Sequence, residues 1–150
     1  MTGLKSLSLA HTVITDDALK HLSGLNALER LDLTATDVGD AGLAHLKGLT
    51  GVTDLALDHS FRFTDAGFAH LSGMTKLRKL GVFRTRISDK SAKVIAGFTA
   101  LQHLNFNYTD VGDETMRAVA GLTELKSLGV DSTFVGDKSR DSLLALNPQF

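Results

Sequence analysis

The chain repeats itself with a period of about 24 residues, and every copy has leucine-type residues at the same offsets. The copies begin at Leu4, Leu28, Val52, Leu77, Leu101 and Leu125, so the successive steps are 24, 24, 25, 24 and 24 residues. A fixed short period of this kind is typical of a solenoid, in which each unit packs only on its neighbours. We therefore expect a single domain, residues 1–150, built from six stacked repeats.

The spacing of the leucines changes partway through each copy. Leu31 and Leu33 alternate with polar residues, as in a short half-buried strand. Leu43, Leu46 and Leu49 recur every three residues, as in a helix. Each copy therefore predicts one strand, one turn and one helix, and stacked copies would place their strands side by side in a parallel sheet.

The aligned copies read L-x-x-L-x-L-x-x-T-x-V-x-D-x-x-L-x-x-L-x-x-L, and this pattern resembles the leucine-rich repeat family, in its ribonuclease-inhibitor-like and bacterial branches, from Leu4 to about Leu146. The resemblance implies a curved, right-handed α/β solenoid with the parallel sheet on the concave face and the helices on the convex face. It also implies a non-enzymatic module that binds a protein partner on the concave face.

Two polar columns have structural interpretations. The family's best-known form has Asn or Cys after the third strand leucine, but this chain has Thr12, Thr36, Ser60, Thr85, Thr109 and Thr133. We expect these hydroxyls to bond backbone groups where the chain leaves the strand. The acidic column is Asp16, Asp40, Asp65, Asp89, Asp113 and Asp137. Each Asp opens a predicted helix, so the carboxylates are expected to cap free helix N–H groups rather than to hold calcium.

The chain has no recognisable motif for catalysis, for phosphate cradling or for dinucleotide binding, so we expect no enzyme activity and no cofactor. His21, His45 and His70 occupy one helix column, but neighbouring helices lie roughly 8 to 10 Å apart, too far for shared metal ligation, and we expect exposed positions and no metal. No apolar run approaches the roughly 20 residues that cross a bilayer, and no membrane partner is expected. The absence of cysteine and of a secretory signal favours the cytoplasm.

The polar positions of the strands are expected on the inner face of the sheet, where like positions of neighbouring repeats lie about 4.8 Å apart. Large side chains gather there in the third to fifth repeats. The candidate partner-binding residues are Asp58, His59, Phe61, Lys79, Phe83, Arg84, His103 and Tyr108. Aromatic and arginine side chains carry much of the energy of protein interfaces. Internal pairing is the alternative, with Arg84 stacked on Tyr108 and Lys79 paired with Asp54 in the absence of any ligand.

The single extra residue of the array falls in the third repeat, within Ser60-Phe61-Arg62-Phe63. Phe63 aligns with Val38 and is therefore expected to point inward. A bulge would push Phe61 or Arg62 out at the rim of the inner face. Alternatively, Phe61 folds over the loop as local packing.

Two other functions compete with protein binding. Residues 77–100 carry Arg78, Lys79, Arg84, Arg86, Lys90 and Lys93 against Asp89 alone. This balance of plus five suggests a patch for a polyanion, although nucleic acid is not the expected partner of a chain whose net charge is −1. The third possibility is a spacer or scaffold within a longer repeat protein.

The two ends of the array predict different behaviour. Met1-Thr2-Gly3 aligns with the end of a repeat, so the chain would begin mid-array. An uncovered first repeat would expose an apolar edge and favour self-association, and the leucines concerned are Leu4, Leu7, Leu9, Leu19 and Leu22. Arg140 stands where other repeats have an apolar helix residue, which predicts a finished, solvent-facing last repeat.

Overall fold

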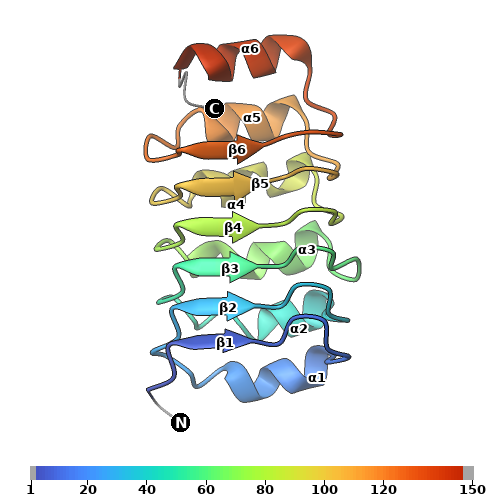
Figure 1. Ribbon diagram of the computed structural model, residues 1–150, viewed down its shortest axis with the longest axis vertical. Coiled ribbons are helices and arrows are strands. Elements are labelled where there is room, and N and C mark those ends of the chain that lie inside the picture. Colours follow the sequence, from blue (N-terminus) through green and yellow to red (C-terminus); the bar gives the residue numbers. More distant parts are fainter. Residues whose placement is uncertain (1–2, 147–150) are drawn as a thin grey trace.

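Six strands form one parallel sheet in chain order in the computed structural model, which describes residues 3–146. The strands are β1 (Ser6–Ser8), β2 (Arg30–Asp32), β3 (Asp54–Ala56), β4 (Lys79–Gly81), β5 (His103–Asn105) and β6 (Ser127–Gly129). The strands lie side by side on one face and the helices lie behind them (Figure 1). The expected α/β solenoid with a parallel sheet is therefore confirmed.

The helical segments are short and mix α and 3-10 geometry. The α-helices are α1 (Asp16–Leu19), α2 (Asp40–Ala44), α3 (Asp65–Phe68), α4 (Ala92–Ala96), α5 (Asp113–Val119) and α6 (Asp137–Leu146). The 3-10 segments are η1 (Lys20–Leu22), η2 (Ala69–Gly73) and η3 (Asp89–Ser91). Apolar residues spaced every three positions suit this mixture, because a 3-10 helix aligns residues i and i+3 on one face.

The core is a continuous column of apolar side chains between the sheet and the helices. The middle residue of every strand is a leucine, and the six leucines stand in register across the sheet: Leu7, Leu31, Leu55, Leu80, Leu104 and Leu128. Four phenylalanines are fully buried, namely Phe63, Phe68, Phe98 and Phe106. Phe68 of the third repeat occupies the helix column in which the fourth repeat has the small residue Ala92. Large and small side chains alternate there, which keeps the stack filled.

A tight turn follows every strand, and its second residue has a left-handed backbone. These residues have φ between 52° and 59°, and they are His11, Ala35, His59, Arg84, Tyr108 and Ser132. Sequence reasoning placed this column on the strand, which is wrong, because the residues lie beyond the strand end. The turn persists because it prolongs the sheet: the Arg84 N–H donates to the Asn107 carbonyl at 2.9 Å, and the Tyr108 N–H donates to the Asp131 carbonyl at 2.8 Å.

Ala35 is suited to testing whether this turn is strained, because its methyl side chain makes few contacts that a change to glycine would remove. A left-handed residue other than glycine costs about 1 to 2 kcal/mol, and glycine removes most of that cost. We expect Ala35→Gly to raise the free energy of unfolding by about 1 kcal/mol in urea denaturation. The matched control, Ala44→Gly at the end of α2, should lower it by about 1 kcal/mol. Destabilisation by both changes would show that the turn is unstrained.

The hydroxyl column bonds the backbone as expected. The Thr36 hydroxyl donates to the Leu33 carbonyl at 2.8 Å, and the Thr85 hydroxyl donates to the Val82 carbonyl at 2.8 Å. Ser60, beside the extra residue, differs: its hydroxyl donates to the carbonyl of Leu33 in the preceding repeat at 3.3 Å. The column therefore satisfies carbonyls that the core would otherwise leave unpaired.

The aspartate column caps helices, but not in the expected way. Each Asp opens its own helical segment, whereas the carboxylates of the first five accept a hydrogen bond from the following repeat. Asp16 accepts from the Gly39 N–H at 2.6 Å, and Asp65 accepts from the Ser88 N–H at 2.9 Å. Asp40, Asp89 and Asp113 do the same for the next repeat. The expectation that each Asp caps its own helix is wrong, and the column instead ties neighbouring repeats together.

The residue two positions after each Asp accommodates the carboxylate of the preceding repeat. Gly67 does so by lacking a side chain, because a Cβ there would overlap the Asp40 carboxylate and lie 2.7 Å from the Asp40 Cα. In the following repeats the same position donates a hydroxyl. Ser91 Oγ donates to Asp65 at 2.5 Å, and Thr115 Oγ1 donates to Asp89 at 2.7 Å.

The two ends of the described array resemble each other more than the sequence suggested. Leu19 and Leu22 of the first repeat are buried, whereas Leu4, Leu7 and Leu9 are half-buried. At the other end Leu128, Val130 and Val135 are also half-buried, and Leu146 is 69% exposed. The burial of Leu19 and Leu22 contradicts an apolar edge made of all five leucines, whereas Arg140 is exposed as expected.

Candidate partner-binding face

A shallow groove of about 500 Å³ runs across the open face of the sheet, over all six strands. Small residues stand in register within it, at Ala56 of β3 and Gly81 of β4. A Cβ at Gly81 would overlap the Asp58 carboxylate. The acid of the third repeat therefore occupies the space that a side chain at Gly81 would need.

The open-face residues form two rows, one at each end of the strands. The first row is Ser6, Arg30, Asp54, Lys79, His103 and Ser127. The second row is Ser8, Asp32, Ala56, Gly81, Asn105 and Gly129. Sequence reasoning correctly placed Asp54, Lys79 and His103 together, and the structure gives their order across the sheet.

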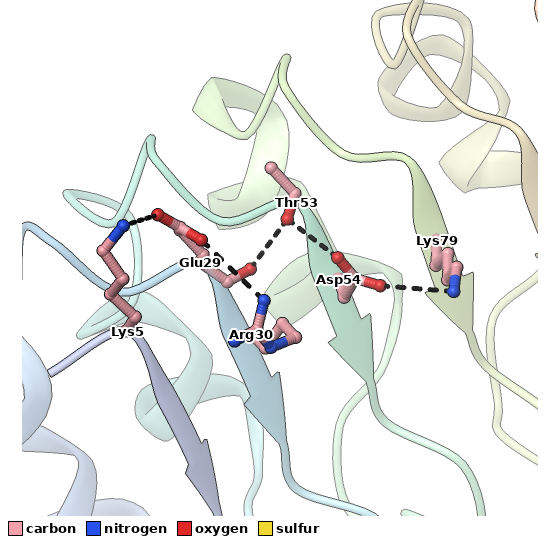
Figure 2. Close-up of polar contacts among 6 residues, drawn as sticks. All are labelled: Lys5, Glu29, Arg30, Thr53, Asp54 and Lys79. Carbon is pink, nitrogen blue, oxygen red and sulfur yellow. Dashed lines mark hydrogen bonds and ion pairs between the residues drawn. The ribbon is translucent and has the colours of Figure 1, made fainter.

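The charges at the first row pair with one another, as Figure 2 shows. Lys79 lies 3.8 Å from Asp54, which confirms the internal pairing considered from the sequence. Glu29 holds two cations, with Lys5 at 2.9 Å and Arg30 at 3.8 Å. Such exposed ion pairs contribute little stability, but they leave these cations partnered within the chain.

His103 and Ser127 close the first row, with His103 Nδ1 at 2.8 Å from Ser127 Oγ. A nucleophilic serine needs a histidine whose other nitrogen is oriented by a third group. Within residues 3–146, no hydrogen bond joins His103 Nε2 to a carboxylate. The pair therefore lacks the orienting group of a catalytic triad.

Two half-buried carboxylates near the ends of the strands hold turns in place: Asp32 of the second row and Asp58 in the turn after β3. Asp32 accepts the Thr34 N–H at 3.0 Å. Burial would raise the pKa of Asp32, but hydrogen bonds from Thr34 and Ser8 outweigh it and lower the pKa. Asp58 accepts the Phe83 N–H at 2.7 Å, and burial raises its pKa despite that bond. Asp58 therefore fixes the turn of the fourth repeat to that of the third.

Three rings form what we call the aromatic rim, made of His59, Phe83 and Tyr108 in the turns after β3, β4 and β5. The His59 and Phe83 centroids are 4.9 Å apart and the Phe83 and Tyr108 centroids are 5.4 Å apart, both in edge-to-face geometry. Arg84 Cζ lies 5.9 Å from the Tyr108 ring centroid, which confirms the stacking considered from the sequence. Tyr108 is still 56% exposed, so the rings support each other and remain accessible.

The extra residue of the third repeat produces an exposed bulge after β3. Phe63 is fully buried, as expected, whereas Phe61 is 50% exposed and Arg62 is exposed. This supports the bulge interpretation over packing of Phe61 across the loop. The loop between β3 and α3 stands out from its neighbours at the edge of the stack (Figure 1).

The basic residues of the fourth repeat do not form one patch. Arg78 and Lys79 stand at the start of β4, Arg84 and Arg86 follow the strand, and Lys90 and Lys93 lie in η3 and α4 on the helical side. The excess charge is therefore spread around the cross-section of the repeat. A continuous polyanion surface, which the residue count suggested, is not what the fold presents.

Sequence reasoning considered Arg62 as one outcome of the bulge and Arg86 as part of the basic fourth repeat, but counted neither among the candidate partner-binding residues. Both lie one position beyond the hydroxyl-bearing column and its bulge, in a column that the alignment contains but whose exposure it does not reveal. That column consists of Val13, Asp37, Arg62, Arg86, Asp110 and Phe134. All six are exposed, which the alternation of neighbouring buried residues such as Ile87 and Val111 could have indicated.

The helical side shows no comparable site. His21 and His70 are exposed and His45 is half-buried. In the described part of the chain, no cluster of three or more His, Asp or Glu side chains could hold a metal ion. A search of the same residues finds no helix with the length and apolar character that a membrane span needs.

Six in-register parallel strands, each followed by a short helical segment, with aspartate contacts between successive repeats, define a leucine-rich repeat solenoid. A family model described as Leucine Rich repeat matches residues 99–120, from the end of the fourth repeat through most of the fifth. No curated protein sequence matches the chain. The repeat pattern and the fold are those of leucine-rich repeat proteins, and the family model matches one stretch of the array.

Similar solved structures come from bacteria. An internalin (inlF) of Listeria monocytogenes is 25% identical with a TM-score of 0.78, over 95% of this chain and 46% of its own. An internalin C2 (inlC2) of the same species is 24% identical with a TM-score of 0.70, over 97% of this chain and 68% of its own. A leucine-rich repeat protein of Leptospira interrogans is 17% identical with a TM-score of 0.70, over 95% and 35%. The chain thus spans less than half of the first of these proteins.

Proposed function

We propose that this chain is a non-enzymatic protein-binding module that holds its partner along the open face of the sheet. The aromatic rim carries the proposal, because it places the exposed Tyr108 and the half-buried His59 and Phe83 together in a fixed arrangement at the end of the strands. Edge-to-face contacts order His59, Phe83 and Tyr108 before any partner arrives. Aromatic anchors that are already ordered bind with less loss of conformational entropy.

The groove supplies the rest of the surface. Its walls carry cationic, acidic and amide groups along the two rows, and the small residues Ala56 and Gly81 line it in between. A protein segment crossing the strands would meet polar partners for its backbone and space for a side chain above these small residues. The aromatic rim then supplies the apolar part that protein interfaces surround with polar groups.

Affinity capture with a rim variant tests the proposal. The native chain and a variant carrying Phe83→Ala, Arg84→Ala and Tyr108→Ala are used in parallel to capture proteins from a lysate of the source cells, read by mass spectrometry. A protein bound by the native chain should be lost from the variant, because removal of one such anchor often costs about 2 kcal/mol or more.

A helical-side variant is the matched control. Lys47→Ala, His70→Ala and Lys93→Ala change three exposed residues on the opposite side of the stack and should leave capture intact. Circular dichroism checks that all three proteins are folded. Equal capture by the native chain and the rim variant would contradict the assignment of the site.

A further inference from the structure

The rim also carries three arginines without an anionic partner. This arginine cluster consists of Arg62, Arg84 and Arg86, all exposed, in the loops that follow β3 and β4. Within residues 3–146, none of their guanidinium groups makes an ion pair or a hydrogen bond. The only contact recorded for them is that of Arg84 with the Tyr108 ring.

The other end of the strands behaves differently. There Lys5, Arg30 and Lys79 each lie within 4 Å of a carboxylate, as Figure 2 shows. Three cations at the start of the strands are therefore partnered within the chain, whereas the three arginines of the cluster are not. Unpaired guanidinium groups can form two parallel hydrogen bonds with a carboxylate from outside.

Acidic residues limit the cluster on both sides. Arg62 and Arg86 are neighbours in the column that holds Asp37 in the second repeat and Asp110 in the fifth repeat. Both aspartates are exposed. Along the stack the column thus reads acid, base, base, acid. A long polyanion lying across the repeats would meet Asp37 or Asp110, whereas a segment with only two or three carboxylates would not.

Exposed rings flank the cluster. Phe61 precedes Arg62 in the bulge, and Tyr108 lies beside Arg84. Each ring can pack against an apolar or aromatic residue that lies next to the acidic positions of a ligand. A sugar-phosphate backbone has no apolar side chain beside its charges. The surface therefore favours a peptide that combines a short acidic run with an apolar residue.

We propose that the arginine cluster recognises a short acidic segment of a protein partner, with two or three Asp or Glu residues flanked by an apolar side chain. This assignment rests on the proposed protein-binding function and names the chemistry of the partner at the rim. Carboxylates of the segment bind Arg62, Arg84 and Arg86, and the neighbouring apolar residue packs on Phe61 or Tyr108.

The test uses a phage-displayed library of random 12-residue peptides as the probe. Selection is run on three proteins. They are the native chain, an arginine variant with Arg62→Gln, Arg84→Gln and Arg86→Gln, and a control with Arg78→Gln, Lys90→Gln and Lys93→Gln. Both variants lose three positive charges from the same part of the array, but only the first loses them at the rim. Enriched peptides are then synthesised, and their affinity is measured by fluorescence polarisation.

The native chain and the control should enrich peptides with adjacent acidic and apolar residues. The arginine variant should bind those peptides at least about tenfold more weakly. Enrichment of peptides without acidic residues would overturn the acidic-segment inference and leave the protein-binding function standing. Equal binding of acidic peptides by the native chain and the arginine variant would also overturn the acidic-segment inference. Failure of all three proteins to enrich any peptide would count against the proposed function itself.

Discussion

Phe98→Ala is expected to lower the free energy of unfolding by about 4 kcal/mol. Phe98 is fully buried and lies edge-to-face with Phe68 of the preceding repeat, with centroids 6.1 Å apart. Alanine would leave a cavity between the third and fourth repeats, in the middle of the array. Because each repeat packs only on its neighbours, other parts of the core cannot fill that gap. Urea denaturation followed by circular dichroism measures the loss.

The natural control is Phe98→Leu, because leucine occupies this column in the first, second, fifth and sixth repeats, at Leu25, Leu49, Leu122 and Leu146. We expect it to cost about 1 kcal/mol. A double-mutant cycle with Phe68→Leu should show a coupling of about 1 kcal/mol between the two rings. A loss below 1 kcal/mol for Phe98→Ala would mean that the repeats close around the missing ring and that the packing is looser than described.

Asp89→Ala is expected to cost about 3 kcal/mol. The Asp89 carboxylate accepts the Gly112 N–H at 2.8 Å, the Thr115 N–H at 2.9 Å and the Thr115 hydroxyl at 2.7 Å. Alanine would leave the start of α5 uncapped and the fully buried Thr115 hydroxyl without its acceptor. Asp110→Ala, which removes an exposed carboxylate without such bonds, should stay within about 0.5 kcal/mol of the native chain.

The same contact predicts a pH dependence. Burial would raise the pKa of Asp89, but hydrogen bonds from Thr115, Gly112 and Glu114 outweigh it and hold the pKa below the ordinary value of 3.8. A carboxylate with a lowered pKa in the folded state stabilises the fold above its unfolded pKa and loses that effect as the pH falls through the folded value. The stability advantage of the native chain over Asp89→Asn should therefore be constant from about pH 7 to 5 and shrink below about pH 4. An advantage that persists undiminished at pH 2 would contradict this assignment.

The fold could be predicted because the same spacing of apolar residues recurs in every repeat. The buried leucines, the hydroxyl column and the inward direction of Phe63 follow from spacing alone. The direction of the Asp89 carboxylate does not, because its partners Gly112 and Thr115 lie 23 and 26 residues further along the chain. Contacts between repeats depend on how the units stack, and a pattern read within one unit does not contain that information.

The sequence suggested which residues of the candidate site pair with one another, but not where the residues lie relative to the strands. The pairings of Arg84 with Tyr108 and of Lys79 with Asp54 were considered from the sequence, and both are present. The alternating pattern was extended past the end of the strand, which placed Arg84 and Tyr108 on the strand. In the structure both residues lie in the turns that follow the strands. The left-handed turn was not recognisable, because none of its six positions has the glycine that usually marks such a backbone.

The absence of glycine from that turn has a consequence for how the rim can change. Its backbone is the same in six repeats although its side chains are His, Ala, His, Arg, Tyr and Ser, so the conformation does not depend on residue type. In the first five repeats the N–H of this residue also donates to a carbonyl of the next repeat. Side chains at these positions leave the core untouched. The array thus has six surface positions with the same backbone conformation. Substitutions at one repeat at a time could change which partner sequence is recognised without altering the core.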